Sequence, residues 1–103
     1  MVKTWTPPVA GAQTSFTRAM TEQDVEVFAE LTDTWDPLHY DDVFAQTTSF
    51  GHAVMPSTAL SAILQAEVAR RLVGPGAVVT RQVWDHPAPV FVGDTLTVEA
   101  TVT

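Results

Sequence analysis

The sequence contains no cysteine, and this absence removes several kinds of chemistry. Disulfide bonds, zinc–thiolate sites and thiol nucleophiles are all excluded. Basic residues are also scarce: five lysines and arginines stand against twelve aspartates and glutamates, which gives a formal net charge of −7 at pH 7. This balance argues against nucleic acid and against an anionic membrane surface as partners.

Long apolar runs are missing from the amino-terminal region. Residues 1–13 hold prolines and a glycine but no continuous hydrophobic stretch, so they predict an extended arm and neither a signal peptide nor a membrane anchor. We therefore expect a cytoplasmic protein. With 103 residues, 46% of them hydrophobic, the chain can form one domain with a modest core, and domains of this size often gain stability from a partner chain.

The first third of the chain predicts a strand followed by short helices. Residues 14–20 alternate in the manner of a strand. Thr21 and Asp24 form the capping-box pattern that begins a helix, and apolar residues at helical spacing extend that helix over residues 22–31. Residues 41–45 are expected to add one more helical turn.

The longest predicted element is a helix over residues 57–72. Ser57 is its expected N-cap, and the Gly-Pro-Gly sequence at residues 74–76 is its expected end. Its few polar residues crowd the carboxyl-terminal half, so we expect the amino-terminal half to be buried on nearly every side.

After this helix the hydrophobic period changes to two. Residues 78–84 and 96–103 both predict strands. The second stops without a turn signal, so we expect its partner strand to come from sequence beyond residue 103 or from another chain.

One polar stretch precedes the long helix and concentrates the candidate chemistry. Residues 32–42 read TDTWDPLHYDD, with one histidine and four carboxylates around Asp36-Pro37. Proline biases the residue before it away from helical conformation, so a turn or a helix entry is expected there. His39 then lies near the positive end of a short helix, where a neutral imidazole can act as a general base. The same residues also fit a surface loop whose acids cap helices, with His39 incidental.

The histidines do not form a metal-binding pattern. His39, His52 and His86 lie at spacings that match no zinc motif, so we predict no metal site and no cofactor. His52 is expected in the loop before the long helix, and His86 in a proline-rich surface bend.

The polar stretch belongs to a longer pattern that is similar to a known family. Residues 28–41, FAELTDTWDPLHYD, resemble the signature of MaoC-like (R)-specific enoyl-CoA hydratases and dehydratases, roughly F-A-x-L-[ST]-G-D-x-N-P-L-H-x-D. Residues 44–45, 50–51 and 89–96 resemble later blocks of the family in the same order. The resemblance implies an α+β hot-dog fold, with an antiparallel sheet wrapped around a long central helix. It also implies a single domain over residues 1–103 that lacks the last strands of the family.

The resemblance also implies a reaction and its residues. In this family an aspartate and a histidine activate a water molecule and move a proton, so that enoyl and 3-hydroxyacyl thioesters interconvert. His39 stands at the position of the family histidine. Thr34 stands where the family has its aspartate, Asp33 where it has glycine, and Asp36 where it has asparagine. Asp36 or Thr34 is therefore the implied second catalytic group, with Asp33 available after a small local shift.

Substrate contacts follow from the same alignment, which puts Pro56-Ser57 where the family has a His-Gly pair. Backbone N–H groups at the start of the long helix are expected to polarise the thioester carbonyl. The implied substrate-binding residues come from the turn, the following loop and the start of the helix: Asp33, Trp35, His52, Ser57 and Thr58. Tyr40, like Trp35, flanks the motif and fits either an acyl slot or the core.

Three functions fit these observations. The first is a hydratase or dehydratase of an acyl thioester with His39 as general base. The second is a degenerate, non-catalytic subunit of a hetero-oligomeric hydratase, because the family aspartate is replaced. The third is a tailoring enzyme, a cyclase or isomerase of a polyketide-like thioester. The implied partners are an acyl-CoA or acyl carrier protein thioester and a second hot-dog chain, in a homodimer or a heterodimer.

Overall fold

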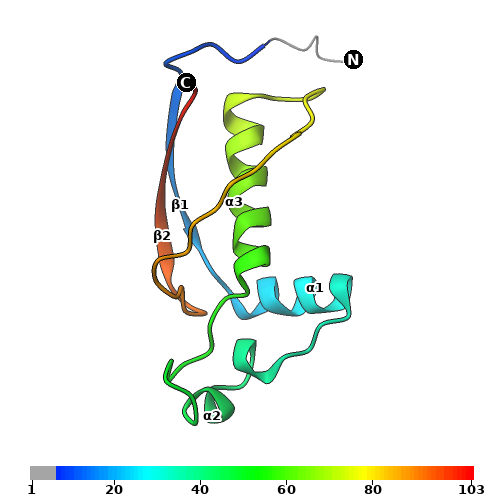
Figure 1. The fold of residues 1–103 in the computed structure, drawn as a ribbon, viewed down its shortest axis with the longest axis vertical. Helices are drawn as coiled ribbons and strands as arrows, with labels where there is room; N and C mark the ends of the chain where they lie inside the picture. The colour runs from blue at the N-terminus through cyan, green and yellow to red at the C-terminus, as the bar shows by residue number, and fades with distance from the viewer. Residues whose placement is uncertain (1–6) are drawn as a thin grey trace.

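A computed structural model describes residues 7–103 as two strands and several helices around one long helix (Figure 1). The elements in chain order are β1 (Gln13–Ala19), α1 (Glu22–Thr32), a 3-10 turn (Pro37–His39), α2 (Asp42–Ala45), α3 (Ser57–Leu72) and β2 (Thr95–Thr101). Of the predicted amino-terminal arm, residues 1–6 lie outside the described residues, and residues 7–12 are coil with one turn.

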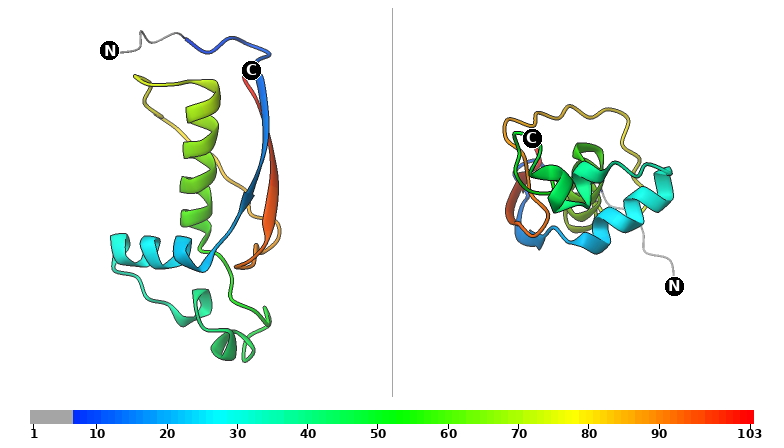
Figure 2. Two further views of the ribbon diagram at one scale, coloured as in Figure 1. Left: turned by 180° about the vertical axis from the view of Figure 1, so that it is seen from behind. Right: turned by 90° about the horizontal axis from the view of Figure 1, so that it is seen from below.

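The two strands pair antiparallel and lie along α3 (Figures 1 and 2). Gln13 lies opposite Thr101 at one end and Ala19 opposite Thr95 at the other. These strands confirm the positions predicted for residues 14–20 and 96–103 to within two residues at each end. The expected partner of the second strand was wrong, because β2 pairs with β1 of the same chain and not with a strand from beyond residue 103 or from another chain. The fold is thus α+β, with an antiparallel sheet packed on the long helix.

α1 begins as its sequence predicts. The Thr21 hydroxyl accepts the backbone N–H of Asp24, and the Asp24 carboxylate accepts the N–H of Thr21, which confirms the capping box. Arg18 of β1 also donates two hydrogen bonds to Asp24, at 2.8 and 2.9 Å. The bonds from the guanidinium lower the pKa of the Asp24 carboxyl to about 2, so this pair ties β1 to the start of α1.

The start of α3 differs from the prediction. Pro56, not Ser57, is the N-cap, because the Pro56 backbone is extended and its carbonyl accepts the N–H of Leu60 at 3.0 Å. Ser57 is therefore the first helical residue, and no side chain caps the helix. The predicted burial on nearly every side is also wrong: Ala59 and Leu60 are buried, whereas Thr58 and Ala62 are exposed.

The core lies where β1, α1 and the first turns of α3 meet. Four buried residues form its centre, and partly buried residues of α3 and of the segment leading into β2 pack around them; the four are Met20, Val25, Met55 and Leu60. Two short backbone pairings join this region, from the Met55 N–H to the Val90 carbonyl at 2.7 Å and from the Val92 N–H to the Ala53 carbonyl at 2.9 Å. These pairings hold the loop before α3 against the segment before β2.

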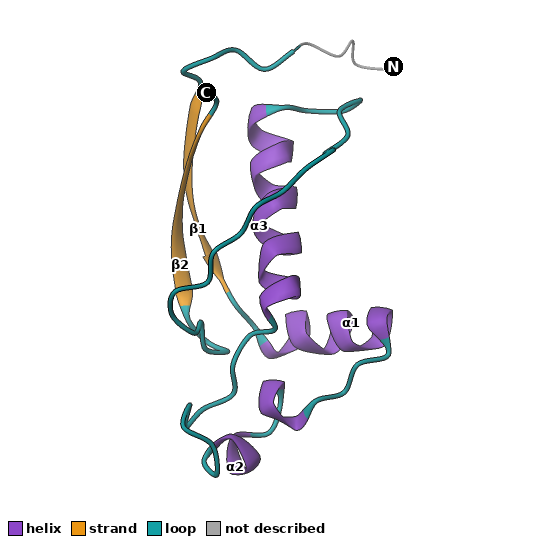
Figure 3. Cartoon of the chain, in the orientation of Figure 1, coloured by secondary structure: helices purple, strands orange, loops and turns teal. Residues whose placement is uncertain are grey.

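The predicted strand over residues 78–84 is wrong. This segment runs back along α3 as a loop, drawn in teal in Figure 3. A strand needs a backbone partner, and within residues 7–103 no other segment pairs with this one. Val78 and Val83 are accordingly 85% and 75% exposed. Among residues 7–103, no helix is long and apolar enough to cross a membrane.

Candidate active site

The Asp-Pro turn places His39 through local hydrogen bonds. The Asp36 carboxylate accepts the Leu38 N–H at 3.0 Å, and Pro37 occupies the first position of the 3-10 turn. The His39 N–H then bonds to the Asp36 carbonyl at 3.0 Å. Proline and a side-chain cap together favour this turn, and it holds His39 half-buried at the edge of the core.

A backbone contact orients the imidazole of His39. Its Nδ1 lies 2.6 Å from the Val54 carbonyl oxygen. Because a carbonyl only accepts hydrogen bonds, Nδ1 carries a proton, and in the neutral ring Nε2 has a free lone pair. Val54 is itself held by its N–H bond to Leu38, at 3.1 Å, and by its bridge to Phe91. The ring is therefore oriented by a carbonyl whose own position is fixed by backbone pairing.

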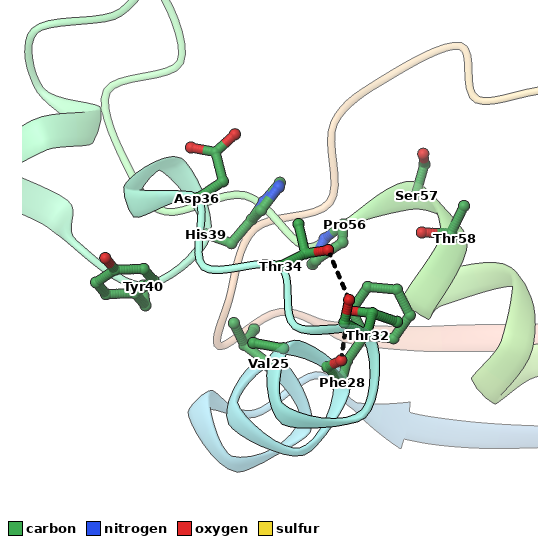
Figure 4. Close-up of a pocket in the computed structure, with 11 residues that line it drawn as sticks. Val25, Phe28, Thr32, Thr34, Asp36, His39, Tyr40, Pro56, Ser57 and Thr58 are labelled. Atoms are coloured by element: carbon green, nitrogen blue, oxygen red, sulfur yellow. Dashed lines mark hydrogen bonds between the residues drawn. The ribbon is translucent and has the colours of Figure 1, made fainter.

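His39 lines a cavity of about 310 Å³ between α1, the Asp-Pro turn and the start of α3. Figure 4 shows Thr34, Asp36 and His39 on the loop that leaves α1, facing Ser57 and Thr58 on the first turn of α3. The full lining is Val25, Phe28, Ala29, Thr32, Thr34, Asp36, His39, Tyr40, Pro56, Ser57 and Thr58. Five of the eight sequence-predicted site residues thus meet at one cavity.

Two oxygen-bearing side chains of the same segment line the cavity together with the imidazole. Asp36 contributes the only carboxylate in the cavity lining, and Thr34 contributes a hydroxyl. The Thr34 hydroxyl donates a long hydrogen bond of 3.3 Å to the Thr32 carbonyl, which leaves its oxygen able to accept a hydrogen bond from a bound molecule. Both groups can therefore help to hold a water molecule near His39.

The first turn of α3 supplies hydrogen-bond donors to the same cavity. The first N–H groups of a helix have no partner within the helix, and here no side chain caps them. Ser57 and Thr58 line the cavity and are exposed. This end of the helix carries partial positive charge, so it can stabilise a carbonyl oxygen that becomes negative.

The other three predicted residues lie outside this cavity. Asp33 ends α1 in left-handed conformation, with φ of 55°, and is exposed. Trp35 borders an adjacent cavity of about 430 Å³ and contacts Tyr40 edge to face, with ring centroids 6.3 Å apart. His52 is exposed and packs edge to face on Phe91 at 6.0 Å.

The sequence reasoning missed two parts of the site. One is the apolar wall from α1, made by Val25, Phe28 and Ala29. Their helical spacing places them on one face of a helix, but this signal does not say what that face packs against. The other is the Val54 carbonyl, for which no sequence signal exists because every residue has a carbonyl.

The described residues hold no metal-binding arrangement: within residues 7–103, no three histidine, aspartate or glutamate side chains gather as ligands.

Comparisons with known proteins give a consistent result. The model of the MaoC like domain family matches residues 6–103. The (R)-specific enoyl-CoA hydratase of Rhodospirillum rubrum is 34% identical over 93 residues, which are 90% of this chain and 65% of that protein. The (R)-specific enoyl-CoA hydratase of Aeromonas caviae is 35% identical over 80 residues, 78% of this chain and 60% of that protein. The chain therefore spans less than two thirds of the length of these relatives.

Solved structures agree with the sequence matches. An (R)-hydratase from Aeromonas caviae involved in PHA biosynthesis superposes with a TM-score of 0.83 at 30% identity, over 92% of this chain and 72% of that chain. An R-hydratase from Pseudomonas aeruginosa superposes with a TM-score of 0.79 at 31% identity, over 88% of this chain and 59% of that chain.

Proposed function

Because the chain belongs to the MaoC-like domain family and has the hot-dog fold of its hydratase relatives, we propose that it is a hydratase or dehydratase of acyl thioesters, with His39 as general base. It would interconvert enoyl and 3-hydroxyacyl thioesters. The observation that carries the proposal is the hydrogen bond from His39 Nδ1 to the Val54 carbonyl, which leaves Nε2 as a base in a cavity lined by the uncapped start of α3.

In the hydration direction, a water molecule lies beside His39, Asp36 and Thr34. Nε2 of His39 removes a proton from the water as its oxygen bonds to Cβ of the enoyl group. The electron pair of the double bond moves toward the thioester carbonyl, and its oxygen becomes negative against the N–H groups at the start of α3. The protonated His39 then returns a proton to Cα, and dehydration follows the same steps in reverse.

The replaced aspartate gives Asp36 a larger role in this proposal. A hydroxyl at Thr34 accepts a hydrogen bond but carries no charge, so it stabilises a protonated imidazole less than a carboxylate does. Asp36 is the one carboxylate that lines the cavity, and one of its oxygens already accepts the Leu38 N–H. We therefore expect wild-type activity to be low, and Thr34→Asp to raise it.

Hydration of a crotonyl thioester tests the proposal, measured with CoA and with an acyl carrier protein as the carrier. Loss of a general base costs roughly 100- to 10,000-fold in rate, so His39→Ala should lower kcat by that factor. Glu30→Gln is the control, because Glu30 is exposed on α1 and does not line the cavity. Equal rates for wild type and His39→Ala, with both proteins folded by circular dichroism, would reject His39 as the base.

A second candidate function is the non-catalytic subunit of a hetero-oligomeric hydratase. It is favoured by Thr34 at the aspartate position and by the commitment of an Asp36 oxygen to the 3-10 turn. Under this alternative the wild-type chain is inert alone and hydrates crotonyl thioester only when mixed with a second hot-dog chain. The cyclase or isomerase function stays a prediction.

The proposed partners are an acyl-CoA or acyl carrier protein thioester and a second hot-dog chain. The exposed valines of residues 78–84 support a protein partner, because their burial would stabilise association; they are Val78, Val79 and Val83. Light scattering on the purified chain measures whether it is a dimer, and co-expression with other hot-dog chains distinguishes homodimer from heterodimer. The cytoplasmic location also stays a prediction.

A further inference from the structure

Residues 53–55 form the short segment that carries the hydrogen-bond partner of the His39 ring. The Val54 N–H bonds to the Leu38 carbonyl at 3.1 Å, and the Val54 carbonyl oxygen lies 2.6 Å from His39 Nδ1, so both groups face the Asp-Pro turn. The segment also pairs with residues 90–92 through two backbone hydrogen bonds, of 2.7 and 2.9 Å. Because these groups belong to one stretch of paired backbone, the position of the Val54 carbonyl depends on the whole segment.

Asp42 holds the beginning of this segment. Its Oδ1 accepts the Ala53 N–H at 2.8 Å, across 11 residues of sequence. Ala53 is buried, and a hydrogen bond to a charged acceptor is stronger than one between neutral groups. Among residues 7–103, His39 and Asp42 are the two side chains that hydrogen-bond to the backbone of residues 53–55. The Asp42 bond therefore fixes the point where the loop after α2 becomes paired backbone.

The position of Asp42 in α2 makes this long-range contact available. Asp42 is the first residue of α2, but the N-cap is Asp41, whose carboxylate accepts two N–H groups of the first turn. α2 follows the 3-10 turn directly (Figure 1), and the Asp41 N–H bonds to the Pro37 carbonyl at 2.9 Å. Asp42 and His39 thus extend from one hydrogen-bonded unit to two consecutive residues of the facing segment.

We propose that Asp42 is a positioning residue for His39. This inference rests on the proposed function. By holding the Ala53 N–H, the Asp42 carboxylate keeps the Val54 carbonyl against Nδ1, which retains the proton there and leaves Nε2 as the base. Asp42 does not line the candidate active site, so it acts through the backbone and not on the substrate. Without it the Val54 carbonyl shifts, and the ring proton is shared between the two nitrogens.

Two substitutions separate the hydrogen bond from the negative charge. Asp42→Asn keeps an oxygen that accepts the Ala53 N–H, whereas Asp42→Ala removes it. Misplacing a catalytic group by about 1 Å can cost on the order of 100-fold in rate, so kcat for crotonyl thioester should fall at least about tenfold in Asp42→Ala. KM should stay within about twofold, because no substrate contact is lost.

Asp42→Asn should keep kcat within roughly threefold of wild type, because its neutral amide oxygen makes the same bond more weakly. An equal loss of kcat in Asp42→Asn and Asp42→Ala would overturn the proposal, since it would assign the effect to the charge of Asp42.

Nitrogen NMR of the His39 ring measures the positioning directly. At a pH where the ring is neutral, wild type and Asp42→Asn should carry the proton on Nδ1, and Asp42→Ala should share it between Nδ1 and Nε2. The spectrum of His39→Ala identifies the signals of this ring. A merely structural role for Asp42 would lower the stability of the variants and leave the ring proton of the folded protein in place.

Val43→Ala is the matched control for α2. Val43 is the next residue of the helix, is 74% exposed and lines neither the candidate active site nor the adjacent cavity beside Trp35. Its kcat and ring proton should match those of wild type. A loss of kcat in Val43→Ala as large as in Asp42→Ala would overturn the proposal, because any weakening of α2 would then suffice.

The two measurements distinguish this inference from the proposed reaction. A wild type that hydrates no thioester, but whose ring proton leaves Nδ1 in Asp42→Ala, would reject the reaction and support the positioning role. An active wild type whose kcat and ring proton are both unchanged in Asp42→Ala would support the reaction and reject the positioning role.

Discussion

At the scale of single residues, one backbone oxygen determines which nitrogen of His39 can accept a proton. The Val54 carbonyl holds the proton on Nδ1, so the nitrogen left to accept a proton is Nε2. The hydrogen-bond partner is not a side chain, and the contact therefore depends on the position of the loop before α3. Substitutions that move this loop should affect catalysis even where they leave His39 in place.

Asp24 offers a residue-scale prediction of stability against pH. Its folded pKa of about 2 lies below the ordinary value of 3.8, because Arg18 and the Thr21 cap stabilise the carboxylate. The stability that it contributes is therefore fully present above pH 4 and is lost as the pH falls from 4 through 2. Asp24→Asn should lower the free energy of unfolding at pH 7 by roughly 1–2 kcal/mol, a value reduced for partial exposure to solvent.

Urea unfolding at several pH values measures this effect. The difference in free energy of unfolding between wild type and Asp24→Asn should be constant from pH 5 to 8 and should become smaller below pH 4. Arg18→Gln is the matched variant and should show the same narrowing, because it removes the other partner of the pair. A difference that persists undiminished at low pH would mean that the ion pair does not account for it.

At the scale of elements, α3 begins in a way that favours binding over helix stability. In many helices the side chain of the N-cap residue accepts a hydrogen bond from one of the first N–H groups. The side chain of Pro56, the N-cap of α3, makes no such bond. The uncapped donors line the candidate active site, where the proposal needs them for a thioester oxygen. The start of α3 therefore lacks the stability that a capping hydrogen bond would add, at the end where the helix would contact substrate.

The substitution Pro56→Ser would give α3 a side chain that can cap its first turn. Its hydroxyl can accept an N–H of the first turn, so Pro56→Ser should raise helix stability by about 0.5–1 kcal/mol. The same hydroxyl would compete with the thioester oxygen, and kcat/KM for crotonyl thioester should fall on the order of tenfold. Thermal unfolding and initial-rate kinetics measure the two effects. A variant that gained stability and kept full activity would show that these N–H groups do not contact the substrate.

At the scale of the whole molecule, negative charge opposes the approach of an acidic carrier. The formal net charge is −7, and within residues 7–103 three of the four basic side chains are engaged in ion pairs. Arg18 pairs with Asp24, and Arg70 and Arg71 share Glu67, which lowers the pKa of Glu67. In the described part of the chain, little free positive charge therefore remains to attract a phosphate group.

Salt should relieve this repulsion. The screening length falls from about 30 Å at 0.01 M salt to about 10 Å at 0.1 M, so KM for crotonyl-CoA should fall by a factor on the order of three. An uncharged crotonyl thioester of N-acetylcysteamine is the control, and its KM should not change. A KM for crotonyl-CoA that rises with salt would instead indicate a local basic site for the carrier.

The sequence alone determined the elements that depend on short-range signals. The capping box predicted the start of α1, hydrophobic periodicity predicted α3 and both strands, and the Asp-Pro pair predicted the turn before His39. These signals work because caps, proline geometry and residue spacing act within a few residues of the chain. The family motif likewise predicted His39 as a site residue without any knowledge of the fold.

Only the tertiary structure decided features that need a distant partner. Residues 78–84 have the composition of a strand, but within residues 7–103 no backbone lies beside them to pair with. Packing of α1 against α3 sets which of the predicted site residues line one cavity. Five of them do, namely Thr34, Asp36, His39, Ser57 and Thr58, whereas Asp33, Trp35 and His52 do not. The Val54 contact and the bond from Ala53 to Asp42 join segments whose proximity no local pattern records. Packing is a property of the folded chain, and local sequence signals do not contain it.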